Sequence, residues 1–123
     1  MSLVPNIAAI GLVVLTATAA NAAPAGSAAQ LRAGRELAQT VCSACHQVEA
    51  KQETLIVLDP PAPSFQTIAD KPGTTQAGLR KFMAHTKWDA HTLPMTMPDL
   101  MLTPEQQDVL SRYILSQKTI APR

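Results

Sequence analysis

Apolar residues recur at helical spacing from Gln30 to Val41 and predict the first helix of an all-α chain. One side of this helix carries Leu31, Gly34, Leu37, Ala38 and Val41. Gly34 lies in the helix interior, where glycine costs about 1 kcal/mol relative to alanine. We therefore expect another helix to pass close to Gly34, because glycine has no side chain to hold it away.

The last helix is predicted to begin at Thr103. Thr103 suits the N-cap, Pro104 suits the first helical position, and Gln106 completes a capping box. Its apolar face consists of Val109, Leu110, Tyr113 and Ile114.

Two further helical segments are predicted between these ends. The break at Lys71-Pro72-Gly73 precedes a helix that Thr74 or Thr75 caps and that runs to about Trp88. Its inward side carries Leu79, Phe82, Met83 and Thr86. Phe65 and Ile68 fit one helical turn before the break. The expected fold is therefore all-α, with about four helices.

Residues 47–63 show no helical pattern. The apolar run Leu55-Ile56-Val57-Leu58 fits either a short strand or an extended segment, and periodicity does not decide between them. The following Asp59-Pro60-Pro61-Ala62-Pro63 requires extended backbone and excludes both a helix and a central strand.

Residues 1–22 have the pattern of an export signal. Ile7 to Ala20 is uncharged and largely apolar, and Ala20-Asn21-Ala22 supplies a small-x-small cleavage site. No Lys or Arg precedes the apolar run, so an uncleaved anchor is the alternative, although its Ala, Thr and Asn content makes it a poor membrane span. We expect a flexible leader at 23–29, one domain at 30–118, a tail at 119–123 and a periplasmic location.

The candidate chemistry lies in Cys42-Ser43-Ala44-Cys45-His46, a C-x-x-C-H arrangement that attaches c-type haem covalently. Cys42 and Cys45 on one short turn can each form a thioether to one porphyrin edge, and His46 then serves as proximal axial ligand to the iron. One imidazole nitrogen binds iron while the other is oriented by an acceptor. The carbonyl of Pro63, in the rigid proline-rich stretch, is the candidate acceptor.

Three other interpretations compete with haem. A thioredoxin-type C-x-x-C expects a βαβ pattern, which the flanking helix and loop do not show. A zinc site would have to recruit the distant His85 and His91, a spacing unlike compact zinc signatures. A disulfide between Cys42 and Cys45 would close too small a loop to stabilise the fold much.

Composition agrees with a haem core. Aromatic residues make up only 3% of the chain, and a buried porphyrin supplies the flat apolar mass that they usually provide. The motif uses both cysteines, so none is left for disulfides. The formal net charge is +1 and there is no basic run, which excludes nucleic acid as the expected partner.

Leu93 to Pro98 is a second stretch with candidate ligands. Two prolines stiffen a loop that carries Met95 and Met97, either of which can supply a thioether opposite His46. Spacing does not decide which of the two methionines binds. The alternative is that both fill gaps in the core. Trp88 is expected either to pack on haem, with its indole N–H donating to a propionate, or to lie at an interface.

Together these motifs resemble a class I cytochrome c over almost the whole chain after the signal. The matching residues are Gly34, Leu37, the CSACH run, Pro63-Ser64-Phe65, Met97-Pro98, Leu102-Thr103, Glu105 and Tyr113-Ile114. The resemblance implies a small fold wrapped around one haem c, with Met97 rather than Met95 as distal ligand. It also implies that the first helix crosses the last near Leu110 and Tyr113. The Leu55–Leu58 run and the lack of a glycine before Pro63 depart from the family pattern.

The resemblance implies a non-enzymatic one-electron carrier, a monomer or a subunit, between a redox donor and an acceptor whose identities the sequence does not give. A cytochrome subunit bound permanently to a dehydrogenase or oxidase is one alternative. A haem enzyme or gas sensor with an open distal position is another, and the loop that carries Met95 and Met97 argues against it.

Overall fold

The computed structural model describes residues 26–85 and 97–120. They form four helices: α1 Ala28–Val41, α2 Phe65–Asp70, α3 Gln76–His85 and α4 Pro104–Ser116. Within the described ranges there is no strand, and the extended pairing is one isolated bridge between His46 and Ala62. The all-α prediction is confirmed.

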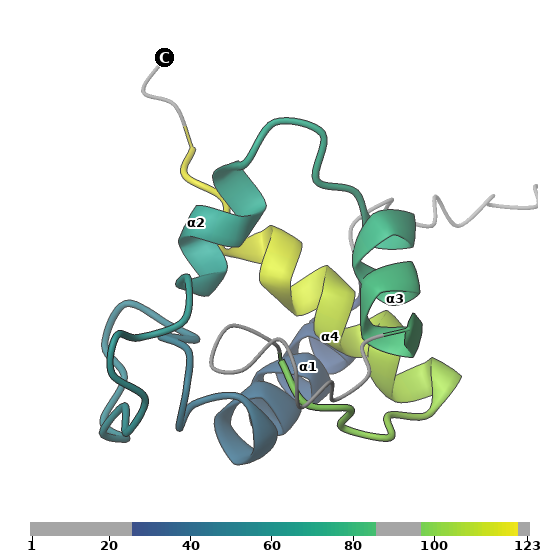
Figure 1. Ribbon diagram of the computed structural model, residues 1–123. Coiled ribbons are helices and arrows are strands. Elements are labelled where there is room, and N and C mark those ends of the chain that lie inside the picture. Colours follow the sequence, from purple (N-terminus) through teal and green to yellow (C-terminus); the bar gives the residue numbers. More distant parts are fainter. Residues whose placement is uncertain (1–25, 86–96, 121–123) are drawn as a thin grey trace, which may run out of the picture.

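Helix α4 is the centre of the fold, since α1, α2 and α3 each contact it. Figure 1 shows α1 crossing α4, with α2 and α3 placed along the same helix. At the crossing, a Cβ added to Gly34 would lie 2.3 Å from the carbonyl oxygen of Val109 and 2.7 Å from Cβ of Tyr113. The close approach that the sequence predicts at Gly34 is therefore present, near Tyr113 as the resemblance implied.

Helix α1 begins at Ala28 rather than at Gln30. Ser27 is its N-cap: Ser27 Oγ accepts from Gln30 N at 3.3 Å, and Gln30 Oε1 accepts from Ser27 N at 2.9 Å. This capping box satisfies two backbone donors that would otherwise be left unpaired. It extends the ordered helix into the segment that was expected to be a flexible leader.

The other two long elements begin as predicted. Thr103 caps α4 with a capping box to Gln106 and Pro104 in the first turn. Thr75 caps α3, because its Oγ1 accepts from Gly78 N at 3.1 Å. Helix α3 is described to His85, so its expected end near Trp88 lies outside the described residues.

One expectation for α3 is wrong. Met83 is buried at 6% exposure, but Phe82, which was expected on the inward side, is 57% exposed. Gln76 Nε2 donates to Asp108 Oδ1 at 2.8 Å and fixes which side of α3 faces α4. Met83 follows Gln76 by two helical turns and shares that side, whereas Phe82, one position earlier, lies on a different side of the helix.

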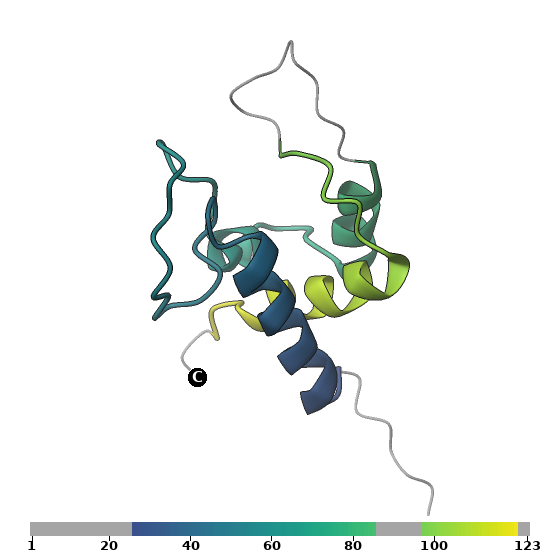
Figure 2. The same cartoon turned by 90° about the horizontal axis from the view of Figure 1, so that it is seen from below.

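The Leu55–Leu58 run does not form a strand. It lies in the irregular loop 47–63, where Leu55 and Val57 are largely exposed. Figure 2 shows this loop and helix α3 on opposite sides of the molecule. The strand alternative is therefore wrong for this run, whose backbone is irregular.

A small core joins the helices to the loop. Its buried apolar members are Ala38, Cys42, Val48, Phe65, Ala69, Met83, Leu110, Tyr113 and Ile114. Phe65 and Tyr113 meet edge to face with ring centroids 6.2 Å apart, and Tyr113 Oη donates to the carbonyl of Val48 at 3.2 Å. The phenol thus ties α4 to the chain just after the CSACH run.

The segment after α4 is hydrogen-bonded to α2 at Thr119. Asp70 accepts from the backbone N–H and the hydroxyl of Thr119, at 2.8 and 2.6 Å. The tail expected from residue 119 therefore begins with a residue bonded to α2. None of the described helices has the length and apolar character needed to cross a membrane.

Candidate haem site

The CSACH run forms one compact turn directly after α1. The N–H of Cys42 donates to Ala38 and ends the helix, and the carbonyl of Cys42 accepts from the N–H groups of Cys45 and His46 at 3.1 and 2.9 Å. Cys42 is buried and Cys45 is half-buried, and neither forms a disulfide. The turn therefore keeps both thiols and the imidazole on one short loop of backbone.

The environment of Cys42 does not fit a redox dithiol. Burial, followed by the effect of neighbouring Cys45, raises the pKa of the Cys42 thiol to about 12. Thioredoxin-type chemistry requires the opposite, a thiol whose pKa is lowered so that thiolate is present. The disulfide alternative is likewise not formed, because both cysteines are free.

The described part of the chain has no cluster of side chains that could bind zinc. Among residues 26–85 and 97–120, no three His, Cys, Asp or Glu side chains gather to hold a metal ion. Nδ1 of His85 instead lies 2.8 Å from the carbonyl of Lys81 within its own helix. His91 lies outside the described residues.

The ring of His46 is oriented by Pro63. Nδ1 of His46 lies 2.7 Å from the carbonyl oxygen of Pro63. A carbonyl can only accept, so this nitrogen carries the hydrogen and donates. Among the described residues the ring makes no other hydrogen bond, which leaves Nε2 for a metal.

Pro63 is held in place by backbone pairing between residues 57–65 and the haem turn. Three N–H groups of the later segment donate to carbonyls of the turn: Val57 to Ala44 at 2.8 Å, Ala62 to Cys45 at 3.0 Å and Phe65 to Gln47 at 2.9 Å. The proline-rich sequence restricts the backbone of this segment before it pairs. The imidazole and its acceptor are therefore fixed to each other by main-chain bonds on both sides of the contact.

Phe65 supports the same ring from the core. Its ring centroid lies 5.8 Å from that of His46, at an interplanar angle of 53°. Phe65 is buried at the start of α2, where Ser64 caps the helix by accepting from Thr67 N at 3.1 Å. Phe65 thus links His46 to Tyr113 and helix α4.

Of the candidate distal residues, Met97 lies in the described part of the chain. It is half-buried and packs against the core cluster. Figures 1 and 2 show that the segment from residue 97 to 103 runs on the α3 side of the molecule, away from loop 47–63. Met95 and Trp88 lie outside the described residues.

The described residues fit a covalent haem. The turn offers two unpaired thiols and one oriented imidazole. Half-buried apolar side chains surround the core and provide the surface that a porphyrin needs: Leu37, Ile68, Leu79, Met97, Leu100 and Leu102. These donors match the ligand chemistry of haem c.

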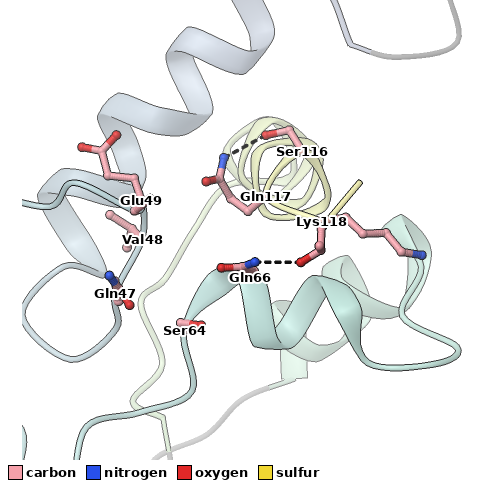
Figure 3. A pocket seen from close by; sticks show the side chains of 10 residues that line it. Gln47, Val48, Glu49, Ser64, Gln66, Ser116, Gln117 and Lys118 are labelled. Carbon is pink, nitrogen blue, oxygen red and sulfur yellow. Dashed lines mark hydrogen bonds between the residues drawn. The ribbon is translucent and has the colours of Figure 1, made fainter. Parts of the chain in front are cut away.

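A polar hollow of about 360 Å³ lies elsewhere, between the exit of the haem turn, the start of α2 and the end of α4. Figure 3 shows Gln66 reaching across it, where its amide donates to Thr119 Oγ1 at 2.7 Å. Glutamine, serine, threonine and lysine side chains dominate its lining. That lining does not suit the apolar face of a porphyrin.

Sequence reasoning missed the polar contacts that tie the haem turn to α1. Glu49 accepts from Arg35 Nε at 2.8 Å, from Arg35 Nη2 at 3.2 Å and from Gln39 Nε2 at 2.7 Å. The hydrogen bond from Arg35, and then that from Gln39, lower the pKa of the Glu49 carboxyl. No local motif announces these contacts, because the residues are ten or more positions apart.

Because the pKa of Glu49 is lower in the folded chain than in the unfolded one, Glu49 stabilises the fold above the unfolded pKa of about 4.3. This contribution is lost as the pH falls through the folded pKa. Glu49→Gln should therefore lower the free energy of unfolding at pH 7, and the deficit relative to wild type should shrink near pH 3. Urea titrations at both pH values measure this. Glu36→Gln, at an exposed position on α1, is the matched control, and an equal deficit at both pH values would contradict the assignment.

Comparison with known proteins identifies the family. The family model described as cytochrome c matches residues 31–118, which is most of the chain. Neither the curated proteins nor the solved structures return a match. The matched range contains the CSACH turn, Pro63, Met97 and helix α4. The chain therefore belongs to the cytochrome c family and is an electron-transfer protein that carries haem c through Cys42 and Cys45.

Proposed function

We propose that the protein is an exported one-electron carrier whose haem iron is ligated by His46 and Met97. The hydrogen bond of 2.7 Å from His46 Nδ1 to the Pro63 carbonyl carries this proposal. It fixes the tautomer that leaves Nε2 without a hydrogen, and it holds the ring in one orientation for a metal. A histidine held only as a core residue would not need its acceptor fixed by three backbone bonds.

The proposed distal ligand is supported by comparison with the other described methionines. Met83 is buried in the core on α3, and Met101 is 87% exposed. Met97 lies between these extremes, half-buried and in contact with the core. A thioether at such a position can reach a cofactor at the edge of the core while being shielded from water.

When bound, haem supplies the one-electron couple between Fe(II) and Fe(III). His46 and Met97 would hold the iron between them, and with both bound the iron would have no open position for oxygen or peroxide. The chain then has no substrate to orient and no proton to move. A carrier, rather than an enzyme, is the function that this arrangement supports.

The proposed setting is the periplasm, with one redox protein as donor and another as acceptor. The support lies in residues 1–22, whose uncharged apolar run and small-x-small site match an export signal.

Met97→Ala tests the distal ligand. Loss of the thioether should lower the midpoint potential and open the iron to carbon monoxide, because methionine ligation raises the potential and fills the sixth position. Redox titration and optical spectra with and without carbon monoxide measure both effects. Met101→Ala, at the exposed position nearby, should leave both unchanged.

The outcomes separate the competing functions. If Met97→Ala keeps the wild-type potential and spectrum while Met95→Ala loses them, Met95 is the ligand. If the wild-type protein is already high-spin and binds carbon monoxide, the iron is open. The carrier proposal would then give way to a haem enzyme or a gas sensor.

A further inference from the structure

Gln52 lies in the loop after the haem turn and uses its whole side-chain amide. Its Oε1 accepts from Val48 N at 2.7 Å, and its Nε2 donates to the carbonyls of Ser43 at 3.0 Å and Thr54 at 2.9 Å. Both amide hydrogens and the amide oxygen therefore have partners. The identity of those partners, one donor and two acceptors, also fixes which end of the amide is nitrogen.

Two of these partners stand on either side of Cys45 and His46. Ser43 precedes Cys45 and His46, and Val48 follows them. Ser43 is 4% exposed and Val48 is 0% exposed, so water does not replace these bonds easily. Gln52 thus bridges the two ends of the turn from which the imidazole projects.

Ser43 and Val48 are each hydrogen-bonded to one of the two helices that cross at Gly34. Ser43 Oγ donates to the carbonyl of Gln39 in α1 at 2.6 Å. The carbonyl of Val48 accepts from Tyr113 Oη in α4 at 3.2 Å. Gln52 therefore joins two segments that are each anchored to a different helix.

We propose that Gln52 is a positioning residue for the haem, which fixes the backbone of the turn between Ser43 and Val48 and so sets the tilt of the His46 ring. This inference rests on the proposed ligation of iron by His46. Pro63 determines how the ring is rotated, through its contact with Nδ1. Gln52 determines where the main chain that carries the ring lies.

The spectroscopic consequence follows from the electronic structure of low-spin ferric haem. The distribution of unpaired spin over the porphyrin follows the orientation of the axial ligand planes. The paramagnetically shifted methyl resonances of the haem therefore report the position of the His46 ring. A residue that only adds stability would leave these resonances in place.

Gln52→Met is the first variant, because methionine has a similar length and makes none of the three bonds. The haem-methyl shifts and the midpoint potential should both move away from their wild-type values. The Val48 amide hydrogen should exchange about tenfold faster, as expected when one buried hydrogen bond is lost. Gln66→Met is the matched control: Gln66 is exposed, and its amide bonds to Thr119 and not to the backbone of the haem turn. The haem-methyl shifts, the midpoint potential and the Val48 amide exchange should therefore stay as in the wild type.

Gln52→Glu separates the acceptor role of the amide oxygen from the donor role of the amide nitrogen. A carboxylate still accepts from Val48 N but donates to neither Ser43 nor Thr54. Protection of the Val48 amide should therefore be retained, while the haem-methyl shifts still move. Unchanged haem-methyl shifts in both variants, with a lower unfolding midpoint, would overturn the inference and make Gln52 a packing residue.

A measurement on the wild-type holoprotein keeps the inference testable if the variants yield no holoprotein. The side-chain amide hydrogens of Gln52 should exchange slowly, since both are bonded. Exchange as fast as that of a freely solvated amide would overturn the inference. A different result would contradict the proposed ligation itself: a wild-type spectrum without the signature of histidine bound to iron.

Discussion

His46→Ala is expected to abolish the accumulation of stable holoprotein. The imidazole is the nitrogen donor that the structure orients in the CSACH turn, through a 2.7 Å bond to Pro63 and a ring contact with Phe65. Alanine supplies no donor to the iron, and it leaves the Pro63 carbonyl without its partner. Because binding of a metal at a site that exists only in the folded chain adds to folding stability, loss of the ligand should also destabilise the fold.

The measurement is the covalently bound haem per milligram of purified protein, by haem-stained gel and pyridine haemochrome. His85→Ala is the matched control, since His85 is exposed and, among residues 26–85 and 97–120, its ring has one hydrogen-bond partner, a backbone carbonyl of its own helix. Its holoprotein yield should equal that of the wild type. Normal amounts of low-spin holoprotein from His46→Ala would show that another residue is the proximal ligand.

Gly34→Ala should lower the stability of the holoprotein by about 1–3 kcal/mol or more. The added Cβ would lie 2.3 Å from the carbonyl oxygen of Val109, which is backbone and has no rotamer to adopt. The two helices have to move apart at the crossing, which loosens the packing of α1 on α4 around Gly34. The roughly 1 kcal/mol that alanine gains over glycine in a helix does not offset this cost.

Denaturant titration of the two holoproteins measures the difference. Gly78→Ala is the matched control on α3, where the nearest atom to an added Cβ is the side-chain oxygen of Thr75 at 3.2 Å. Since Gly78 is exposed, this variant should be as stable as the wild type or more stable. If Gly34→Ala matched Gly78→Ala in stability, the close crossing of α1 and α4 would be disproved.

The sequence predicts best where one local rule decides the structure. The start of α4 is predicted correctly from Thr103, Pro104 and Gln106, because a capping box depends only on residues that are close in sequence. The same rule applies to Ser27 and Gln30, but apolar periodicity begins only at Leu31, so the helix was predicted to start too late. The capping box of Ser27 and Gln30 by itself predicts the observed start of α1 at Ala28.

The polar contacts around the haem turn are not predictable in this way. Glu49 meets Arg35 and Gln39 only because the chain reverses after the CSACH turn and runs back along α1. Gln52 reads as an ordinary loop residue, and its role depends on where the backbone of Ser43 and Val48 ends up. Tertiary structure decides such contacts, and a single sequence carries no local sign of them.

The Tyr113–Val48 bond also bears on the order in which the chain can be assembled. It joins groups 65 positions apart in the sequence, and the helix that supplies the phenol is the last one to be synthesised. Closing so long a loop costs entropy that only the finished core repays. Until α4 has been synthesised, the carbonyl of Val48 therefore lacks its phenol partner, and the CSACH segment lacks the packed surroundings that α4 supplies. Arrival of the C-terminal helix then closes the core against the segment that follows the CSACH turn.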